Sequence, residues 1–332
     1  MQYPTVTVII ATYNSEKTIH KCLQSVQDQN YPQNKIDIIL ADGGSVDSTL
    51  SIVKNFNTRV IHVPPKAQNA EYNKGIGVAQ AKGDLLLMID HDNVLPHTEW
   101  LKKMVRPLQE NKDIVGVETL RYHYDPRQSL LDRYFSLFGA GDPVAFYLGK
   151  VDRLSYIYDA YNLCGNAVDK GSYYIVRFKP DKISTLGANG FIVRRKILVE
   201  NAKVDPDLFF HIDVIVDLIR KGFNTYAFIK DDIIHLTGYK SITNFLFRRK
   251  LFMEQFYIKT YNDRRYSVYE PKDKIRLILF ILYAITFVKP TFDAFRGYIK
   301  IHDIAWFLHP FLCFALFTIY SSVIIKNTIQ KL

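Results

Sequence analysis

The chain has 332 residues, of which 48% are apolar and 14% aromatic, so it can bury one large core or a domain with an appendage. Its three cysteines are far apart and provide neither zinc-ligand spacing nor a disulfide framework, which predicts reduced thiols in a cytosolic compartment. The net charge of +10 comes without a nucleic-acid-binding motif, and we therefore expect no nucleic-acid partner.

Apolar strands and amphipathic helices alternate along the first 120 residues of the chain. Patterns typical of strands lie at residues 6–10, 36–40, 60–63, 85–89 and 114–118. Patterns typical of helices lie between most of them, at residues 16–27, 49–56, 69–80 and 100–108. Repeated strand–helix units with short connections predict an α/β fold, with a doubly wound, mostly parallel sheet and helices on both faces.

Residues 121–184 lose this regularity and are dense in Tyr and Phe. Two interpretations stay open: an irregular region packed through its aromatic side chains, or an insertion that binds an acceptor molecule. The regular pattern returns with a glycine-marked turn into a strand at 186–195, a helix at 214–221 and a short strand at 233–235. We therefore expect one α/β domain over residues 1–240.

Residues 241–332 form a second region of different composition. Residues 244–257 place aromatic residues at helical spacing beside a basic cluster, which is typical of a helix lying on an anionic membrane surface. The 22 residues 304–325 contain no Lys, Arg, Asp or Glu and are long enough to span a bilayer. Residues 277–288 are a shorter apolar stretch, either interfacial or a second span. Helices buried in a soluble domain are the alternative for these segments.

The apolar run at 85–89 ends abruptly in two carboxylates, Asp90 and Asp92. In open α/β sheets, ligands bind outside the carboxyl ends of such strands. Two carboxylates this close repel one another unless a cation lies between or beside them. A solvated Asx turn is the alternative for an isolated Asp-x-Asp sequence.

Three motifs occur in order along the first half of the chain: Val-Ile-Ile-Ala-Thr-Tyr-Asn at 8–14, Asp-Gly-Gly-Ser-Val-Asp-Ser-Thr at 42–49, and Asp-His-Asp at 90–92. Together they resemble the family 2 glycosyltransferases, inverting enzymes with the GT-A fold. The resemblance covers roughly residues 5–240, and the chain looks like the bacterial and archaeal members that build lipid-linked or surface glycans.

The resemblance implies a binding site for a nucleotide-diphosphate sugar. Ala11 and Tyr13, at the end of the first strand, match the segment that contacts the nucleobase. Asp42 matches a carboxylate that accepts a hydrogen bond from a base N–H, a task that suits an acceptor-only group. Asp90 matches the carboxylate that contacts the ribose or the metal ion.

The resemblance also implies a Mg²⁺ or Mn²⁺ cofactor. Asp92 is the expected metal ligand, with Asp90 and His235 beside it, and the ion would neutralise charge on the departing nucleotide. A structural histidine is the alternative for His235. Gly187, Ala188 and Asn189 align with a loop that lies beside the donor sugar and the acceptor in the family.

The chain departs from the family pattern where the general base is expected. Counting back from the glycine after the helix, the usual acidic pair falls on Phe210 and His211, and Asp213 takes the next acidic position. Asp213 and His211 are the two candidate bases, and a helix-capping role is the alternative for Asp213.

A second departure concerns the cation expected near the diphosphate. Tyr72 replaces an Arg that the family often has, and Lys66 and Lys74 are the candidate substitutes.

The predicted function is metal-dependent, inverting sugar transfer to a lipid-linked or surface-glycan acceptor at the cytosolic face of the cell (cytoplasmic) membrane. The first apolar run opens a strand, and we expect no signal peptide there. Transfer directly onto a polyprenyl phosphate is an alternative, because an anionic acceptor needs no base. A nucleotidyltransferase and a non-catalytic membrane scaffold are further alternatives.

Overall fold

The computed structural model describes residues 3–64, 69–260 and 262–330, and the chain forms two compact units. The first unit comprises Met1–His123 and Cys164–Leu236, and the second comprises Tyr124–Leu163 and Thr237–Leu332. The predicted boundary at residue 240 assigned 124–163 to the sheet domain. These residues instead join the C-terminal unit, because their aromatic side chains share its core.

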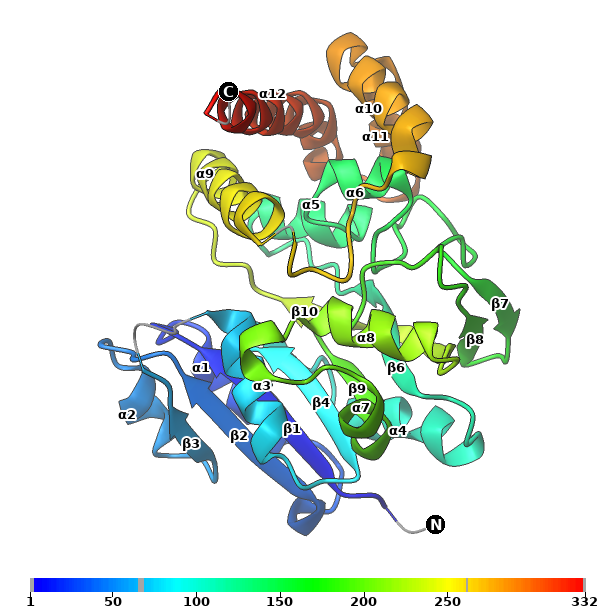
Figure 1. Cartoon of the computed structure of the whole chain (residues 1–332). Helices are drawn as coiled ribbons and strands as arrows, with labels where there is room; N and C mark the ends of the chain where they lie inside the picture. The colour runs from blue at the N-terminus through cyan, green and yellow to red at the C-terminus, as the bar shows by residue number, and fades with distance from the viewer. Residues whose placement is uncertain (1–2, 65–68, 261, 331–332) are drawn as a thin grey trace. The chain divides into compact units, whose positions relative to one another are not determined.

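The first unit contains the sheet and most of the helices that were predicted. Its elements are β1 Val6–Thr12, α1 Ile19–Gln27, β2 Ile36–Asp42, α2 Thr49–Val53, β3 Arg59–His62, α3 Ala70–Gln80, β4 Leu85–Asp90, β5 Asn93–Val94, α4 Trp100–Glu110, β6 Gly116–Tyr122, β7 Asn166–Asp169, β8 Tyr173–Arg177, β9 Phe191–Arg194, α7 Arg195–Asn201, α8 His211–Arg220 and β10 Thr225–His235. The alternation of strand and helix that the sequence predicts is therefore present (Figure 1).

The sheet has the strand order β3-β2-β1-β4-β9-β6-β10-β8-β7, and β5 pairs with β10 (Figure 1). Strands β3, β2, β1 and β4 run parallel to one another, and β6 runs parallel to β10. Strand β9 lies antiparallel between β4 and β6. The predicted α/β class is confirmed, and the sheet is mixed because β9, β8, β7 and β5 run against their neighbours.

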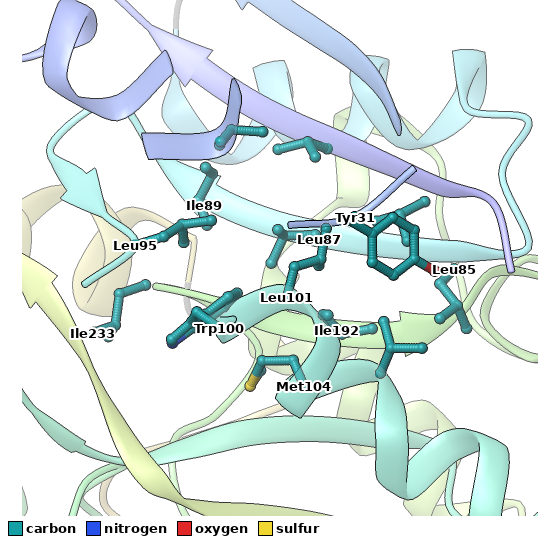
Figure 2. Packing of buried hydrophobic residues seen from close by; sticks show 14 of the residues in the cluster. Tyr31, Leu85, Leu87, Ile89, Leu95, Trp100, Leu101, Met104, Ile192 and Ile233 are labelled. Atoms are coloured by element: carbon teal, nitrogen blue, oxygen red, sulfur yellow. The ribbon is translucent and has the colours of Figure 1, made fainter. Parts of the chain in front are cut away.

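One face of the sheet is covered by α1 and α4. Side chains of a strand alternate between faces, so Leu85, Leu87 and Ile89 of β4 point to the same side. There they pack against Trp100 and other side chains of α4 (Figure 2). Each fully buried side chain of this size contributes about 1.5–3 kcal/mol. The apolar run therefore keeps β4 inside the sheet and leaves the first polar residue at its rim.

The opposite face of the sheet is covered by α3, which lies very close to β1. A Cβ atom at Gly77 would be only 2.4 Å from the Cγ2 atom of Ile9. A Cβ atom at Gly75 would be 2.9 Å from the Cβ atom of Phe209, just before α8. The two glycines thus let α3 pack tightly on β1 and against the segment that leads into α8.

The second unit is helical. Its helices are α5 Leu130–Phe138, α6 Pro143–Leu148, α9 Ile242–Phe252, α10 Lys274–Thr286, α11 Val288–Lys300 and α12 Leu308–Ile329. Helix α5 is capped before its first residue by Ser129, whose side chain accepts a hydrogen bond from the Asp132 N–H, and after its last residue by the left-handed Gly139. Its aromatic face packs on α12, where the Phe138 and His309 rings stack 3.9 Å apart. Part of the aromatic-rich region at 121–184 therefore packs in the core of this unit.

The C-terminal helices include one segment that is long and apolar enough to cross a membrane. Among the described residues this segment is Ile304–Ile329. The helices Pro271–Thr286 and Val288–Lys300 pass the same test only as a pair, and they are bent by 81°. The basic cluster near 248 is partly neutralised inside the unit, because the Arg249 guanidinium pairs with Asp142.

Candidate functional site

The carboxyl ends of β1, β2 and β4 meet at one edge of the sheet. Ala11 of β1 is in register with Ala41 of β2 on one side and with Asp90 of β4 on the other, and Thr12 is in register with Asp42. Tyr13 follows β1 directly, and its side chain is 44% exposed. The predicted nucleotide-contacting residues therefore come from one row of strand ends, as parallel pairing requires.

Asp42 is fully buried and shapes the turn that follows β2. Its Oδ2 atom accepts hydrogen bonds of 3.0 Å from the backbone N–H groups of both Gly44 and Ser45, and the Ser45 hydroxyl donates to Oδ1. The carboxylate thus holds residues 43–45 close to the end of β1. A contact between Asp42 and a nucleobase N–H would share an oxygen that already accepts a bond.

Asp92 lies beside His235. Strand β5 begins one residue after Asp92 and pairs antiparallel with the end of β10, with Asn93 opposite His235. The Asp92 Oδ2 and His235 Nε2 atoms are 3.5 Å apart. Burial on its own raises the pKa of the Asp92 carboxyl. The charge of His235 and the hydrogen bond between the two side chains outweigh burial and lower that pKa to about 2. Asp92 is therefore ionised throughout the physiological range.

Asp90 is paired with a lysine from α3. The Lys74 Nζ atom lies 2.9 Å from Asp90 Oδ1 and 3.2 Å from Oδ2, and the Lys74 residue is only 2% exposed. Burial opposes the charged ammonium, but Asp90 and Glu71 raise the pKa of Lys74 well above its ordinary value. Lys74 is thus a permanent cation at the end of β4, while Lys66 lies outside the described residues.

His211 is the first residue of α8 and is held by Glu71 from the first turn of α3. The His211 backbone N–H donates to Glu71 Oε2 at 2.8 Å, and the His211 Nδ1 atom lies 2.9 Å from Glu71 Oε1. The imidazole remains 20% exposed. One carboxylate therefore caps α8 and orients the ring at the same time.

Asp213 lies in the first turn of the same helix and is fully buried, with 0% exposure. The helix begins three residues earlier than predicted, which turns Asp213 inward and leaves His211 at the helix end. The two candidate bases are thus close in sequence but differ in access to solvent.

The loop 187–189 lies against the start of α8. Gly187 has a φ of +106°, and a Cβ atom there would be 2.9 Å from the backbone oxygen of His211. The Asn189 side chain donates to the Tyr122 hydroxyl at 3.1 Å. Ala188 lies between them, and the Gly190 N–H donates to the Met88 carbonyl of β4 at 2.9 Å. The antiparallel β9 therefore brings this loop to the same edge as Asp90.

The residues at this edge fit a divalent cation with few protein ligands. Within the described ranges, no group of three or more His, Cys, Asp or Glu side chains is arranged to hold a metal ion. Two adjacent ligands of an ion held at about 2.1 Å lie about 3 Å apart, so the 3.5 Å between Asp92 and His235 fits one ion after a small adjustment. Phosphate and water oxygens would complete such a site. Asp90 is less suited as a ligand, because both of its oxygens already pair with the Lys74 ammonium.

The family model described as glycosyl transferase family 2 matches residues 7–198, which is more than half of the chain. The chain belongs to glycosyl transferase family 2. The matched region contains β1, β2, β4 and the loop 187–189, and so it includes the whole row of strand ends described above.

Curated relatives of this family 2 chain match part of its length. Glycosyltransferase AglE of Haloferax volcanii is 32% identical over 138 residues, which is 40% of this chain and 45% of AglE. A dolichyl N-acetyl-alpha-D-glucosaminyl phosphate 3-beta-D-2,3-diacetamido-2,3-dideoxy-beta-D-glucuronosyltransferase of Methanococcus voltae is 31% identical over 113 residues, 32% of this chain and 35% of the relative. The chain therefore spans less than half the length of these relatives.

A solved structure resembles this family 2 chain over its full length. Mannosyltransferase PcManGT from Pyrobaculum calidifontis, solved in complex with GDP-Man and Mn²⁺, has a TM-score of 0.55 and 15% sequence identity. The similarity covers 100% of this chain and 89% of that chain. At this identity the similarity concerns the fold, and the predicted GT-A fold is confirmed.

The role of Glu71 was not predicted from the sequence. The sequence shows an acidic residue in the first turn of α3, a common and uninformative position. Its partner His211 lies 140 residues further along the chain. Lys74 was predicted as a substitute cation near the diphosphate, and the structure pairs it with Asp90 instead of leaving it open to a ligand.

Proposed function

We propose that the protein transfers one sugar, with inversion, from a nucleotide-diphosphate sugar to a hydroxyl group of a lipid-linked or surface glycan. The observation that carries this proposal is the row of strand ends formed by Ala11, Asp42 and Asp90, with Asp92 and His235 directly beyond it. Family membership and the fold shared with a GDP-Man-bound mannosyltransferase support a nucleotide-sugar donor.

The donor would bind with its nucleobase near Tyr13 and Asp42 and its ribose near Asp90. Asp92 and His235 would hold a Mg²⁺ or Mn²⁺ ion, which would neutralise charge on the departing diphosphate. The loop 187–189 would lie beside the donor sugar and the acceptor. Each of these roles uses a side chain or backbone group at the same edge of the sheet.

An inverting displacement onto a hydroxyl also needs a group that accepts the acceptor proton. Of the two candidates, His211 is partly exposed and Asp213 is fully buried. We therefore assign the base to His211 and a structural role to Asp213. This assignment favours a hydroxyl acceptor over a polyprenyl phosphate, because an anionic acceptor would need no base. The Methanococcus voltae relative, whose name describes transfer to a dolichyl-linked sugar phosphate, supports the same acceptor class.

The second unit would attach the protein to the cytosolic face of the membrane. Among the described residues, twenty of the twenty-five exposed large apolar side chains lie between Ile242 and Ile329. Helix α11 carries four of them in one stripe, at Val288, Phe292, Phe295 and Ile299, opposite its buried face. Flotation of the full chain with phosphatidylglycerol vesicles tests this attachment, and a chain that stays in the aqueous fraction would contradict it.

A thermal-shift panel tests the donor site. GDP-mannose, UDP-glucose and UDP-N-acetylglucosamine are added to the full chain with Mn²⁺, with Mg²⁺ or with EDTA. We expect one nucleotide-sugar to raise the melting temperature with metal, since a ligand at a hundred times its Kd adds about 2.7 kcal/mol of stability. No shift with any donor, together with no release of nucleoside diphosphate, would overturn the proposed function.

A further inference from the structure

Glu71, Lys74 and His211 form a buried charged cluster that ends on the strand-end carboxylate Asp90. The Lys74 ammonium bridges the two carboxylates, at 2.9 Å from Asp90 Oδ1 and 3.5 Å from Glu71 Oε1. Glu71 in turn contacts His211 through both of its oxygens, at 2.8 and 2.9 Å. The Glu71 and Lys74 side chains are 13% and 3% exposed. The cluster is therefore a fixed part of the fold and not a surface ion pair.

The geometry of Glu71 specifies which nitrogen of His211 carries a proton. An ionised carboxylate only accepts hydrogen bonds, so the Nδ1 atom at 2.9 Å from Glu71 Oε1 must be the donor. In a neutral imidazole the other nitrogen, Nε2, is then the acceptor. Within the described part of the chain, Nε2 makes no hydrogen bond to protein, whereas Nδ1 and the His211 backbone N–H are both held.

The charges around Glu71 keep it in the ionised form. Burial alone would raise the pKa of its carboxyl, but His211 and Lys74 lower that pKa well below its ordinary value. The ionised Glu71 carboxylate therefore remains an acceptor for both the backbone N–H and the ring Nδ1–H of His211.

Two glycines let neighbouring elements pack closely on the backbone at the start of α8. The Gly75 position of α3 touches Phe209, two residues before His211, and Gly187 touches the His211 backbone oxygen. Neither position has room for a Cβ atom without a shift of its neighbour. The start of α8 is therefore fixed by α3 on one side and by the loop 187–189 on another.

We propose that Glu71 is a positioning residue that holds His211 with Nδ1 protonated, so that Nε2 accepts the proton of the acceptor hydroxyl. This inference rests on the proposed function. In the step, the hydroxyl proton moves to His211 Nε2, and the hydroxyl oxygen forms a bond to the anomeric carbon. The bond from that carbon to the diphosphate oxygen breaks, and its electron pair leaves with the nucleoside diphosphate. Lys74 pairs with both Glu71 and Asp90 and so links the helix-start carboxylate to the end of β4.

A double-mutant cycle separates positioning from other roles. Nucleoside diphosphate release is measured with Mn²⁺ and the donor that gives the largest thermal shift, for the wild type, Glu71→Gln, His211→Gln and the double variant. We expect Glu71→Gln to lower kcat about 10–100-fold with the donor KM unchanged, as for other residues that orient a functional histidine. In the His211→Gln background the same change should have no further effect. Glu200→Gln, at an exposed position of α7, is the matched control and should retain wild-type kinetics.

An equal loss of kcat from Glu71→Gln in both backgrounds would overturn the inference, because Glu71 would then act without His211. A rise of donor KM with kcat unchanged would overturn it as well, because Glu71 would then serve donor binding.

A spectroscopic measurement decides the tautomer without any turnover. In the full chain with ¹⁵N-labelled histidine, the His211 resonance is identified by its absence from His211→Gln. We expect the Nδ1–H tautomer in the wild type and a shift of this signal in Glu71→Gln but not in Glu200→Gln. An Nε2–H tautomer in the wild type would overturn the inference. If no nucleotide-sugar binds, the proposed function fails, whereas the tautomer still reports whether Glu71 orients His211.

Discussion

Two parts of the site differ in how the chain builds them: the strand-end carboxylates Asp90 and Asp92, and the helix-start pair Glu71 and His211. The carboxylates follow an apolar strand directly, so their place at the sheet edge results from local sequence. The helix-start pair joins residues 140 positions apart, through the tight packing of α3 beside the segment before α8. The first arrangement can be predicted from a motif, and the second depends on how two helices pack.

The largest expected effect tests the strand ends. Asp92→Asn removes the charged oxygen that faces His235, and we expect kcat/KM to fall about 10³-fold, since charge stabilisation by a metal is worth several kcal/mol. The metal-dependent part of the donor thermal shift should disappear with it. Asp47→Asn, in the turn before α2, is a matched control. Retention of the metal-dependent shift in Asp92→Asn would remove Asp92 from the metal site.

The second prediction tests the helix starts. His211→Gln should lower kcat about 10²-fold with little change in donor binding, which is within the usual contribution of a general base. Asp213→Asn should retain most of the activity, because its carboxylate is fully buried. The comparison is made with a glycan hydroxyl acceptor, by following the glycosylated product. If Asp213→Asn instead loses activity and His211→Gln retains it, the base is Asp213 and not His211.

The link between the two parts is Lys74. Lys74→Met leaves Asp90 and Glu71 without the ammonium between them, and breaking a buried ion pair costs about 3–5 kcal/mol. Because Asp90 is 26% exposed, we expect a loss of about 3 kcal/mol in the free energy of unfolding, measured in urea. The exposed Lys196→Met should change stability by less than about 0.5 kcal/mol. If both variants lose the same small amount of unfolding free energy, the pairing of Lys74 with Asp90 and Glu71 does not stabilise the fold.

A smaller effect is expected at Tyr13, which follows the central strand β1 of the row. Tyr13→Ala removes a half-exposed ring directly after β1, and stacking of a base on an aromatic side chain is worth about 1–3 kcal/mol. The donor KM should rise about tenfold or more with kcat unchanged, whereas Tyr13→Phe should behave as the wild type. A fall in kcat alone would place Tyr13 near the reacting sugar instead of the base.

The smallest effect concerns acid stability. The pKa of Glu71 is lowered in the folded state, so its ionised form stabilises the fold above the unfolded pKa of about 4.3, and this contribution is lost as the pH falls further. Stability of Glu71→Gln should therefore decline less steeply than that of the wild type between about pH 5 and pH 3. Urea unfolding at several pH values measures this slope, and parallel slopes would contradict the charged state assigned to Glu71.

The second unit shows a similar division between local pattern and packing. The apolar segment at 304–325 is evident from composition alone, and the structure contains it within a helix. The association of α5 and α6 with that helix was not predicted, because residues 124–163 interrupt the sheet domain in sequence. Nothing local distinguishes Tyr134 and Phe138 from aromatic residues of the sheet domain; their partners Trp306 and His309 lie far along the chain.

By itself, the sequence determined the strands, the α/β class, the family and the strand-end residues Asp42, Asp90 and Asp92. These features depend on short apolar runs and on the rule that such runs end at one edge of a parallel sheet. Tertiary structure alone decided that Lys74 pairs with Asp90 and that Glu71 holds His211, whereas His235 was expected beside Asp92 and lies 3.5 Å from it. Each of these pairs joins two elements whose approach depends on close packing, and glycines such as Gly75 and Gly77 make that packing possible.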